Sequence, residues 1–324
     1  MSQGVLDWVL SILRGPAAPQ PPGGTPAPVS RKVLVLIYDP AVLAEGGRRL
    51  SEVMGWNNPQ SLMQAYINDL RAASGGYANH QVVEVKTLDH LPVKQDGFNY
   101  EVDGFLASLR ANAGFHQPDE ADYERILREE NIHARVRSRE IDEVWLFGPP
   151  YAGFYESRVV GPGAFFCNSE PILTSEPGRR YLVMGFNYQR GVGEMLESFG
   201  HRAEFCLQRV FRRQVGEDNL WERFIRHEKS HPGKAEVGTI HYAPNSEHDY
   251  DWGNQRLVWS GCDNWLRFPD LGGAPRQVSS RDWGSGDIRL HHLWWLERLP
   301  RLNGQVNRVL ANWWEYLLEP NRIV

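Results

Sequence analysis

A stripe of acidic and histidine side chains lies on one predicted helix, between Gly191 and Arg213. Glu194, Glu197, His201 and Glu204 follow one another at intervals of three, four and three residues, so a helix places all four on one face. Such spacings can bring two ligands to one metal ion, and a spare carboxylate can serve as a general base. The sequence predicts Glu197 and His201 as metal ligands, with Glu204 or Glu194 as the base. A helix face that simply meets water is the plainer interpretation.

A second histidine motif, HEKSH at residues 227–231, has the HExxH spelling of a zinc hydrolase helix. In such helices both histidines bind zinc and the glutamate activates a water molecule. The neighbouring residues argue against a zinc site here. Lys229 stands where these helices usually carry an apolar residue, and Pro232 biases His231 away from helical geometry. We interpret this segment as a helix end.

Two loop segments can complete a site around His201. The segment HYAPNSEHDYDW, residues 241–252, gathers histidines and aspartates in a loop-like stretch, and we predict His241 as the third metal ligand. The segment GPPYAGFYES, residues 148–157, carries Tyr151, a candidate hydrogen-bond donor to a developing oxyanion. An acidic surface turn is the alternative interpretation of residues 241–252.

Other residues suggest different chemistry. Cys167 follows a glycine-rich turn, and with His201 or His241 as its base it would form a thiol hydrolase. A cysteine behind two phenylalanines is more often a small buried apolar residue. The chain also has 12 tryptophans and 12 tyrosines, which suit a non-catalytic carbohydrate- or protein-binding protein with aromatic platforms.

The elements that must position these residues alternate between strand and helix. Apolar or β-rich runs predict strands, and helical spacing predicts helices between them. The result is an α/β fold with an at least partly parallel sheet and flanking helices, covered by a Trp/His-rich, loop-rich C-terminal half. Ligands bind at the carboxyl ends of such strands. The predicted strands are 32–38, 81–88, 142–148 and 180–186, and the predicted helices are 60–73, 118–131, 191–213, 288–299 and 307–318.

The chain divides by composition into three parts. Residues 1–14 predict an amphipathic helix, whose segment 5–14 is a candidate docking site for a protein partner. Residues 15–30, rich in Pro, Gly and Ala, predict a linker. Residues 31–324 predict a single domain, made of an α/β half, 31–215, and a loop-rich half, 216–324.

Overall composition restricts the functional classes. The net charge of −5 argues against a nucleic-acid partner, and no apolar run reaches the length of an integral membrane span. The start of the chain does not resemble a signal peptide, which favours the cytoplasm unless a leader precedes it. The segments FGPPYAGFYES and GVGEMLESFGHRAE resemble a set of bacterial proteins without an established activity, so the resemblance implies no residue roles.

Together these features predict an enzyme. The leading hypothesis is a metal-dependent hydrolase of peptide or amide bonds, with zinc as the cofactor and a peptide or glycan as the substrate. The binding protein and the Cys167 thiol hydrolase remain the alternatives.

Overall fold

The sheet is built around β1 (Val29–Tyr38), whose residues 33–38 are all buried. In the computed structural model, which describes residues 23–324, six strands follow the order β4-β1-β5-β8-β6-β7. Strands β4, β1, β5 and β8 run parallel, whereas β6 is antiparallel to β8 and parallel to β7. The predicted α/β fold with a partly parallel sheet is confirmed. The other five strands are β4 (Ala78–Leu88), β5 (Glu143–Gly148), β6 (Ser157–Gly161), β7 (Ile172–Leu173) and β8 (Tyr181–Asn187).

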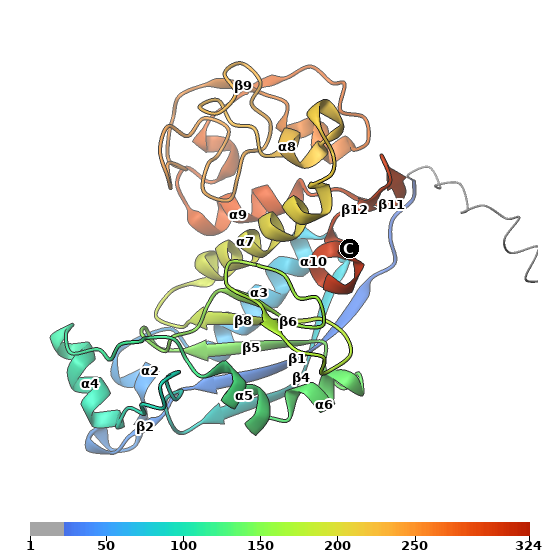
Figure 1. Cartoon of the computed structure of the whole chain (residues 1–324). Coiled ribbons are helices and arrows are strands. Elements are labelled where there is room, and N and C mark those ends of the chain that lie inside the picture. The colour runs from blue at the N-terminus through green and yellow to red at the C-terminus, as the bar shows by residue number, and fades with distance from the viewer. Residues whose placement is uncertain (1–22) are drawn as a thin grey trace, which may run out of the picture.

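Helices cover both faces of this sheet, which explains why its central strands are continuous apolar runs. Val33 and Val35 belong to a core shared with α3 and α7, whereas Leu34 and Leu36 belong to a second core shared with α5 and α6. Figure 1 shows these helices on opposite sides of the sheet. Their bounds are α3 (Pro59–Ala73), α5 (Tyr123–Glu129), α6 (Ile132–Arg137) and α7 (Val192–Phe211).

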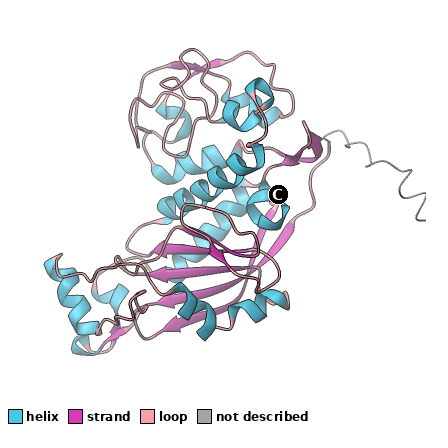
Figure 2. Ribbon diagram, viewed as in Figure 1, coloured by secondary structure: helices cyan, strands magenta, loops and turns pink. Residues whose placement is uncertain are grey.

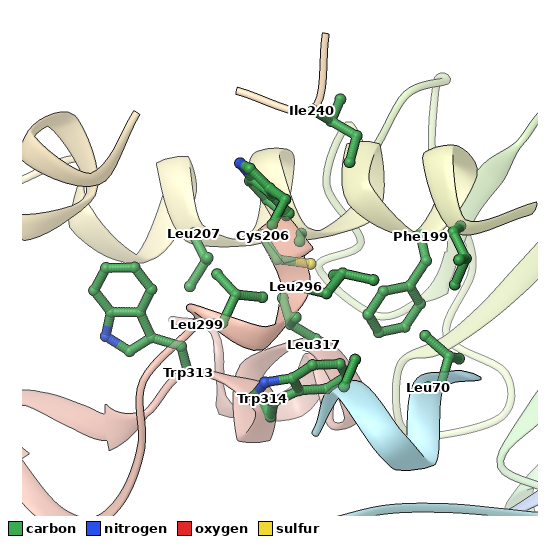
Figure 3. Close-up of a cluster of buried hydrophobic side chains, with 14 of the residues drawn as sticks. Leu70, Phe199, Cys206, Leu207, Ile240, Leu296, Leu299, Trp313, Trp314 and Leu317 are labelled. Carbon is green, nitrogen blue, oxygen red and sulfur yellow. The ribbon is translucent and has the colours of Figure 1, made fainter. Parts of the chain in front are cut away.

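Helix α7 lies between the sheet and the C-terminal half (Figure 1). Its apolar side packs inward, with Phe199 stacked 5.6 Å from Trp314. Figure 3 shows Phe199 and Leu207 pointing from α7 toward Trp313 and Trp314, while Ile240 approaches the helix from the other side. The polar stripe of α7 therefore meets the segment that carries His241.

The C-terminal half consists largely of loops (Figure 2), and an aromatic cluster lies within it. Trp221, Phe224, Trp265, Trp295 and Trp313 contact one another with ring centroids 5.0 to 6.3 Å apart. These rings belong to the same hydrophobic core as α3 and α7. Its elements are α8 (Leu220–Phe224), β9 (Val258–Ser260), β10 (Arg276–Val278), α9 (Ile288–Glu297), β11 (Arg301–Val306), β12 (Val309–Asn312) and α10 (Trp314–Leu318).

The predicted helix over 307–318 is wrong in its first part. Asn307 and Arg308 both adopt left-handed backbone conformations, which form a tight hairpin turn between β11 and β12. Only Trp314–Leu318 is helical. The apolar residues of this segment are spaced as in a helix, but they belong to strand β12 and to the short helix α10 that follows it.

The described residues begin within the predicted linker, at residue 23. The predicted helix 1–14, including its docking segment 5–14, and the first part of the linker lie outside the described residues. The linker ends sooner than residue 30, because β1 begins at Val29 and the amide of Gly23 already donates to the carbonyl of Asn303 in β11.

Several smaller elements complete the fold beside the carboxyl ends of β1 and β4. They surround a small separate core that includes Val42, Leu50 and Phe105. The smaller elements are β2 (Ala41–Val42), β3 (Arg48–Arg49), α2 (Leu50–Val53) and α4 (Val102–Ala111).

Within residues 23–324, none of the helices combines the length and apolar character needed to cross a membrane.

Candidate metal centre

The three residues predicted as metal ligands lie together. One ligand atom each from Glu197, His201 and His241 falls within 4.8 Å of the other two. The Nε2 atoms of His241 and His201 lie 2.8 and 3.9 Å from the same oxygen, Oε1 of Glu197. The spacing on α7 supplies two of these residues, and the loop after Ile240 supplies the third. Whether a metal ion binds there stays a prediction.

Each histidine is also held from its other ring nitrogen by a second carboxylate. Nδ1 of His201 lies 3.0 Å from Oε2 of Glu204, and Nδ1 of His241 lies 3.1 Å from Oδ1 of Asp249. Glu204 is fixed in turn, because its Oε1 accepts a 2.9 Å hydrogen bond from the amide of Ile240. Both imidazoles thus direct Nε2 toward Glu197, the arrangement found around histidine ligands of metal ions.

Charge in this cluster is balanced between carboxylates and imidazoles. Burial disfavours the charge on His201, but the hydrogen bond to Glu204 and the nearby carboxylates outweigh it and raise the pKa of His201. The pKa of His241 is raised in the same way, against burial, chiefly by its hydrogen bond to Glu197. Burial would raise the pKa of Glu197, yet the hydrogen bond and charge of His241, followed by the charge of His201, lower it. A cation bound among these atoms would replace the protons that now hold the three groups together.

A cavity of about 230 Å³ opens at the carboxyl ends of β5 and β8; the three predicted ligands do not line it, but Ser198, the neighbour of Glu197 on α7, does. Glu156 lines the cavity and also interacts electrostatically with His201 and Glu197. Burial raises the pKa of Glu156, while a hydrogen bond from the side-chain amide of Asn168 holds its carboxylate. Glu156 therefore links the cavity to the three predicted ligands. The sequence placed it on a strand-end loop, but spacing alone gave no reason to choose it over its neighbours.

The predicted catalytic residues are distributed differently around the cavity. Glu194 lines it, and one carboxylate oxygen accepts the amide hydrogen of Gly191 at 3.0 Å, so the residue caps α7. Both carboxylate oxygens of Glu204 are engaged, one with His201 and the other with the amide of Ile240. This arrangement suits a residue that orients a metal ligand rather than a general base. Tyr151 also lines the cavity, but its ring stacks on Phe115 with centroids 3.5 Å apart.

Tyr250 stands at the cluster although sequence reasoning did not single it out. Its ring lies 4.4 Å from that of His241, and its side chain helps to lower the pKa of Glu197. Burial, together with the charges of Glu197 and Asp249, raises the pKa of Tyr250 to about 12. The only sequence signal was its place in the loop that begins at His241.

The HEKSH segment forms a turn after the end of α8, not part of a helix. The amide of His231 still donates to the carbonyl of His227 at 2.9 Å, but His231 is exposed and the ring of His227 stacks on Tyr242. Within residues 23–324, the cluster at His201 is the group of three or more ligand side chains that converges.

The structure gives less support to the Cys167 thiol hydrolase and to the aromatic binding protein than to the convergence of the predicted metal ligands. Cys167 is fully buried beside Ser157 and Cys206, so a substrate has no open route to its thiol. Most of the described tryptophans are buried in the core, whereas Trp259 is 56% exposed. Tryptophan platforms are therefore few on the surface that the structure describes, although Tyr151, Tyr155 and Tyr250 are partly exposed.

Comparison with known proteins assigns this chain to no family. No family model, no curated protein and no solved structure matches the chain. The resemblance of the two segments FGPPYAGFYES and GVGEMLESFGHRAE stays a prediction, and any assignment of function rests on the geometry of the site itself.

Proposed function

We propose that the protein is a metal-dependent hydrolase that holds one zinc ion on Glu197, His201 and His241. The observation that supports this most strongly is that both histidines, each held at Nδ1 by a second carboxylate, direct Nε2 to one oxygen of Glu197. Two histidines and one glutamate form a ligand set typical of catalytic zinc, with a fourth position left for water or substrate. Zinc is preferred to magnesium or calcium because two of the three ligands are imidazoles.

The cavity, which is linked to this ligand set through Glu156, is our candidate place for a substrate. A bound zinc ion would supply a Lewis acid and lower the pKa of a coordinated water molecule. Glu156, the carboxylate shared by the cavity and the cluster, is our candidate for the general base that removes a proton from that water. Glu204 and Asp249 keep the two histidines oriented. The proposed reaction is hydrolysis of a peptide or amide bond, whose carbonyl oxygen carries charge in the transition state.

Metal analysis of the full chain tests the first part of this proposal. We expect about one zinc ion per chain after dialysis, and little or none after His201→Ala or His241→Ala. A double variant with His227→Ala and His231→Ala is the matched control, because it removes two histidines outside the cluster and should leave the zinc content unchanged. Zinc content that depends on His227 and His231 instead would move the site to the HEKSH turn.

Hydrolysis of fluorescein-labelled casein by the zinc-loaded chain tests the second part. Glu156→Gln keeps the shape of the side chain but cannot act as a base, so we expect normal zinc content and a loss of activity of about 100-fold or more. Glu194→Gln is the control on the same cavity wall and should lose far less. A Glu156→Gln protein with full activity would show that another group takes the proton.

A further inference from the structure

The loop from His241 to Trp252 holds Tyr250 in a conformation that a tyrosine rarely adopts. Its φ is +60°, in the left-handed region, which is a genuine outlier for a bulky residue. The surrounding loop fixes this conformation. Oδ2 of Asp251 accepts hydrogen bonds from the amide of Glu247 at 2.9 Å and from the side chain of Asn254 at 2.8 Å. Strained residues that persist in this way cluster at functional sites.

The strain brings the phenol ring over the predicted ligands. The backbone amide of Tyr250 donates to the carbonyl of His241 at 3.3 Å, which folds the loop back on itself. The ring then tilts against the imidazole of His241, and the hydroxyl lies close enough to Glu197 to lower the pKa of that carboxyl. Despite these contacts Tyr250 is 52% exposed, so its outer side faces solvent at the mouth of the cluster.

A structural role alone does not explain the position of the hydroxyl. Packing against His241 needs only the ring, and Glu197 already has His241 as a hydrogen-bond partner at 2.8 Å. The hydroxyl instead occupies the neighbourhood of the carboxylate oxygens that would turn to a cation. When Glu197 binds a cation it becomes a weaker acceptor, and the hydroxyl is then free to donate elsewhere.

We propose that Tyr250 is a catalytic residue of this site, whose hydroxyl donates a hydrogen bond to the carbonyl oxygen of the scissile amide as negative charge develops there. The inference rests on the proposed function. Without a cation the hydroxyl would interact with Glu197, and with zinc held by Glu197 it would be free to donate to the substrate. Tyr250 takes the role that the sequence suggested for Tyr151, whose ring is stacked on Phe115.

Acetohydroxamate serves as the probe, because it binds zinc through its oxygens and presents a carbonyl oxygen that carries negative charge. Its affinity for the full, zinc-loaded chain can be measured by calorimetry without knowledge of the substrate. Tyr250→Phe keeps the ring and the backbone strain but removes the hydroxyl, so we expect at least a tenfold weaker affinity for acetohydroxamate. Tyr151→Phe is the matched control, because it removes the hydroxyl of a tyrosine that lines the cavity and stacks on Phe115, and it should bind the probe like the wild type.

Zinc affinity distinguishes catalysis from structural support. Because the hydroxyl competes with zinc for Glu197, we expect Tyr250→Phe to bind zinc as tightly as the wild type or up to about fivefold more tightly. A weaker zinc affinity would make Tyr250 a structural support of His241 and overturn the inference, as would unchanged acetohydroxamate binding. A wild-type chain that binds no zinc would overturn the proposed function and this inference together. Zinc binding by the wild type, together with an acetohydroxamate affinity that Tyr250→Phe leaves unchanged, would overturn the inference alone.

Discussion

The buried ion pair between Arg202 and Glu143 gives a stringent test of how α7 is held on the sheet. Arg202 follows His201 on the helix but points the other way and is 0% exposed. Its Nη1 donates to Oε1 of Glu143 at 2.6 Å, its Nη2 to Oε2 at 3.1 Å, and its Nε to the carbonyl of Leu317 at 2.9 Å. One side chain therefore connects α7 to β5 and to α10.

We expect Arg202→Met to destabilise the protein severely. Methionine fills much of the space, but it leaves the Glu143 carboxylate buried with only the indole hydrogen of Trp145, at 2.8 Å, as a partner. An uncompensated buried charge of this kind costs about 3 to 5 kcal/mol of unfolding free energy. The loss is read from urea unfolding followed by tryptophan fluorescence, with the slope checked for constancy.

The double variant separates the charge from the packing. Glu143→Gln combined with Arg202→Met removes both charges, while the new amide oxygen still accepts from Trp145. We expect the double variant to recover most of the stability and to lie within about 2 kcal/mol of the wild type. A single variant that costs less than about 1 kcal/mol, or a double variant that is less stable than the single one, would refute this reasoning.

Two further predictions concern the approach of the His241 loop to α7 and a buried histidine of the sheet. A Cβ on Gly200 would overlap the side chain of Ile240 and lie 3.1 Å from its Cβ, so Gly200→Ala should displace the loop and weaken zinc binding at least tenfold. Gly104→Ala, on an open position of α4, is the control; it should leave zinc binding unchanged and stabilise the protein by about 1 kcal/mol. Burial lowers the pKa of His80 from 6.5 to about 4. The contribution of the neutral side chain to the free energy of unfolding is therefore complete above pH 6.5, and about 3 kcal/mol of it is lost as the pH falls toward 4. Unfolding free energies at pH 7.5 and pH 4 should therefore differ by about 3 kcal/mol less in His80→Phe, and an equal difference in both proteins would contradict this assignment.

His80 is a useful reporter because no hydrogen bond complicates its titration. Both ring nitrogens are buried without a partner, and the ring packs 5.3 Å from that of Trp145. At His80 the folded protein therefore binds fewer protons than the unfolded chain between pH 4 and 6.5, and the contribution of this residue to stability rises with pH across that window.

Local sequence was sufficient to predict α7 and the two of its residues that converge. The intervals between Glu197, His201 and Glu204 fix their common face in any α-helix, because that relation depends only on 3.6 residues per turn. Sequence reasoning also argued against a zinc-binding helix at HEKSH for a local reason, the proline that follows it, and this segment is a turn in the structure. It failed over residues 307–312, where the left-handed conformations of Asn307 and Arg308 give a hairpin.

The roles within the site depended on contacts that spacing does not encode. Glu204 and Glu194 were equal candidates for the base in the sequence, but the structure engages the first on His201 and Ile240 and uses the second to cap α7. Glu156 and Tyr250 come from segments 45 residues before and 49 residues after His201 in the chain. Their positions follow from the sheet order and from a strained loop.

By itself, then, the sequence determined the alternation of strands and helices, the composition of the polar stripe on α7 and the set of side chains available for a site. Those features follow from short-range periodicity and residue chemistry, which act within one element. Only the tertiary structure decided that His241 turns toward Glu197, that Glu156 faces the cavity and that Arg202 is buried in the core. These relations arise from packing between distant segments, where burial and hydrogen-bond partners depend on the whole fold.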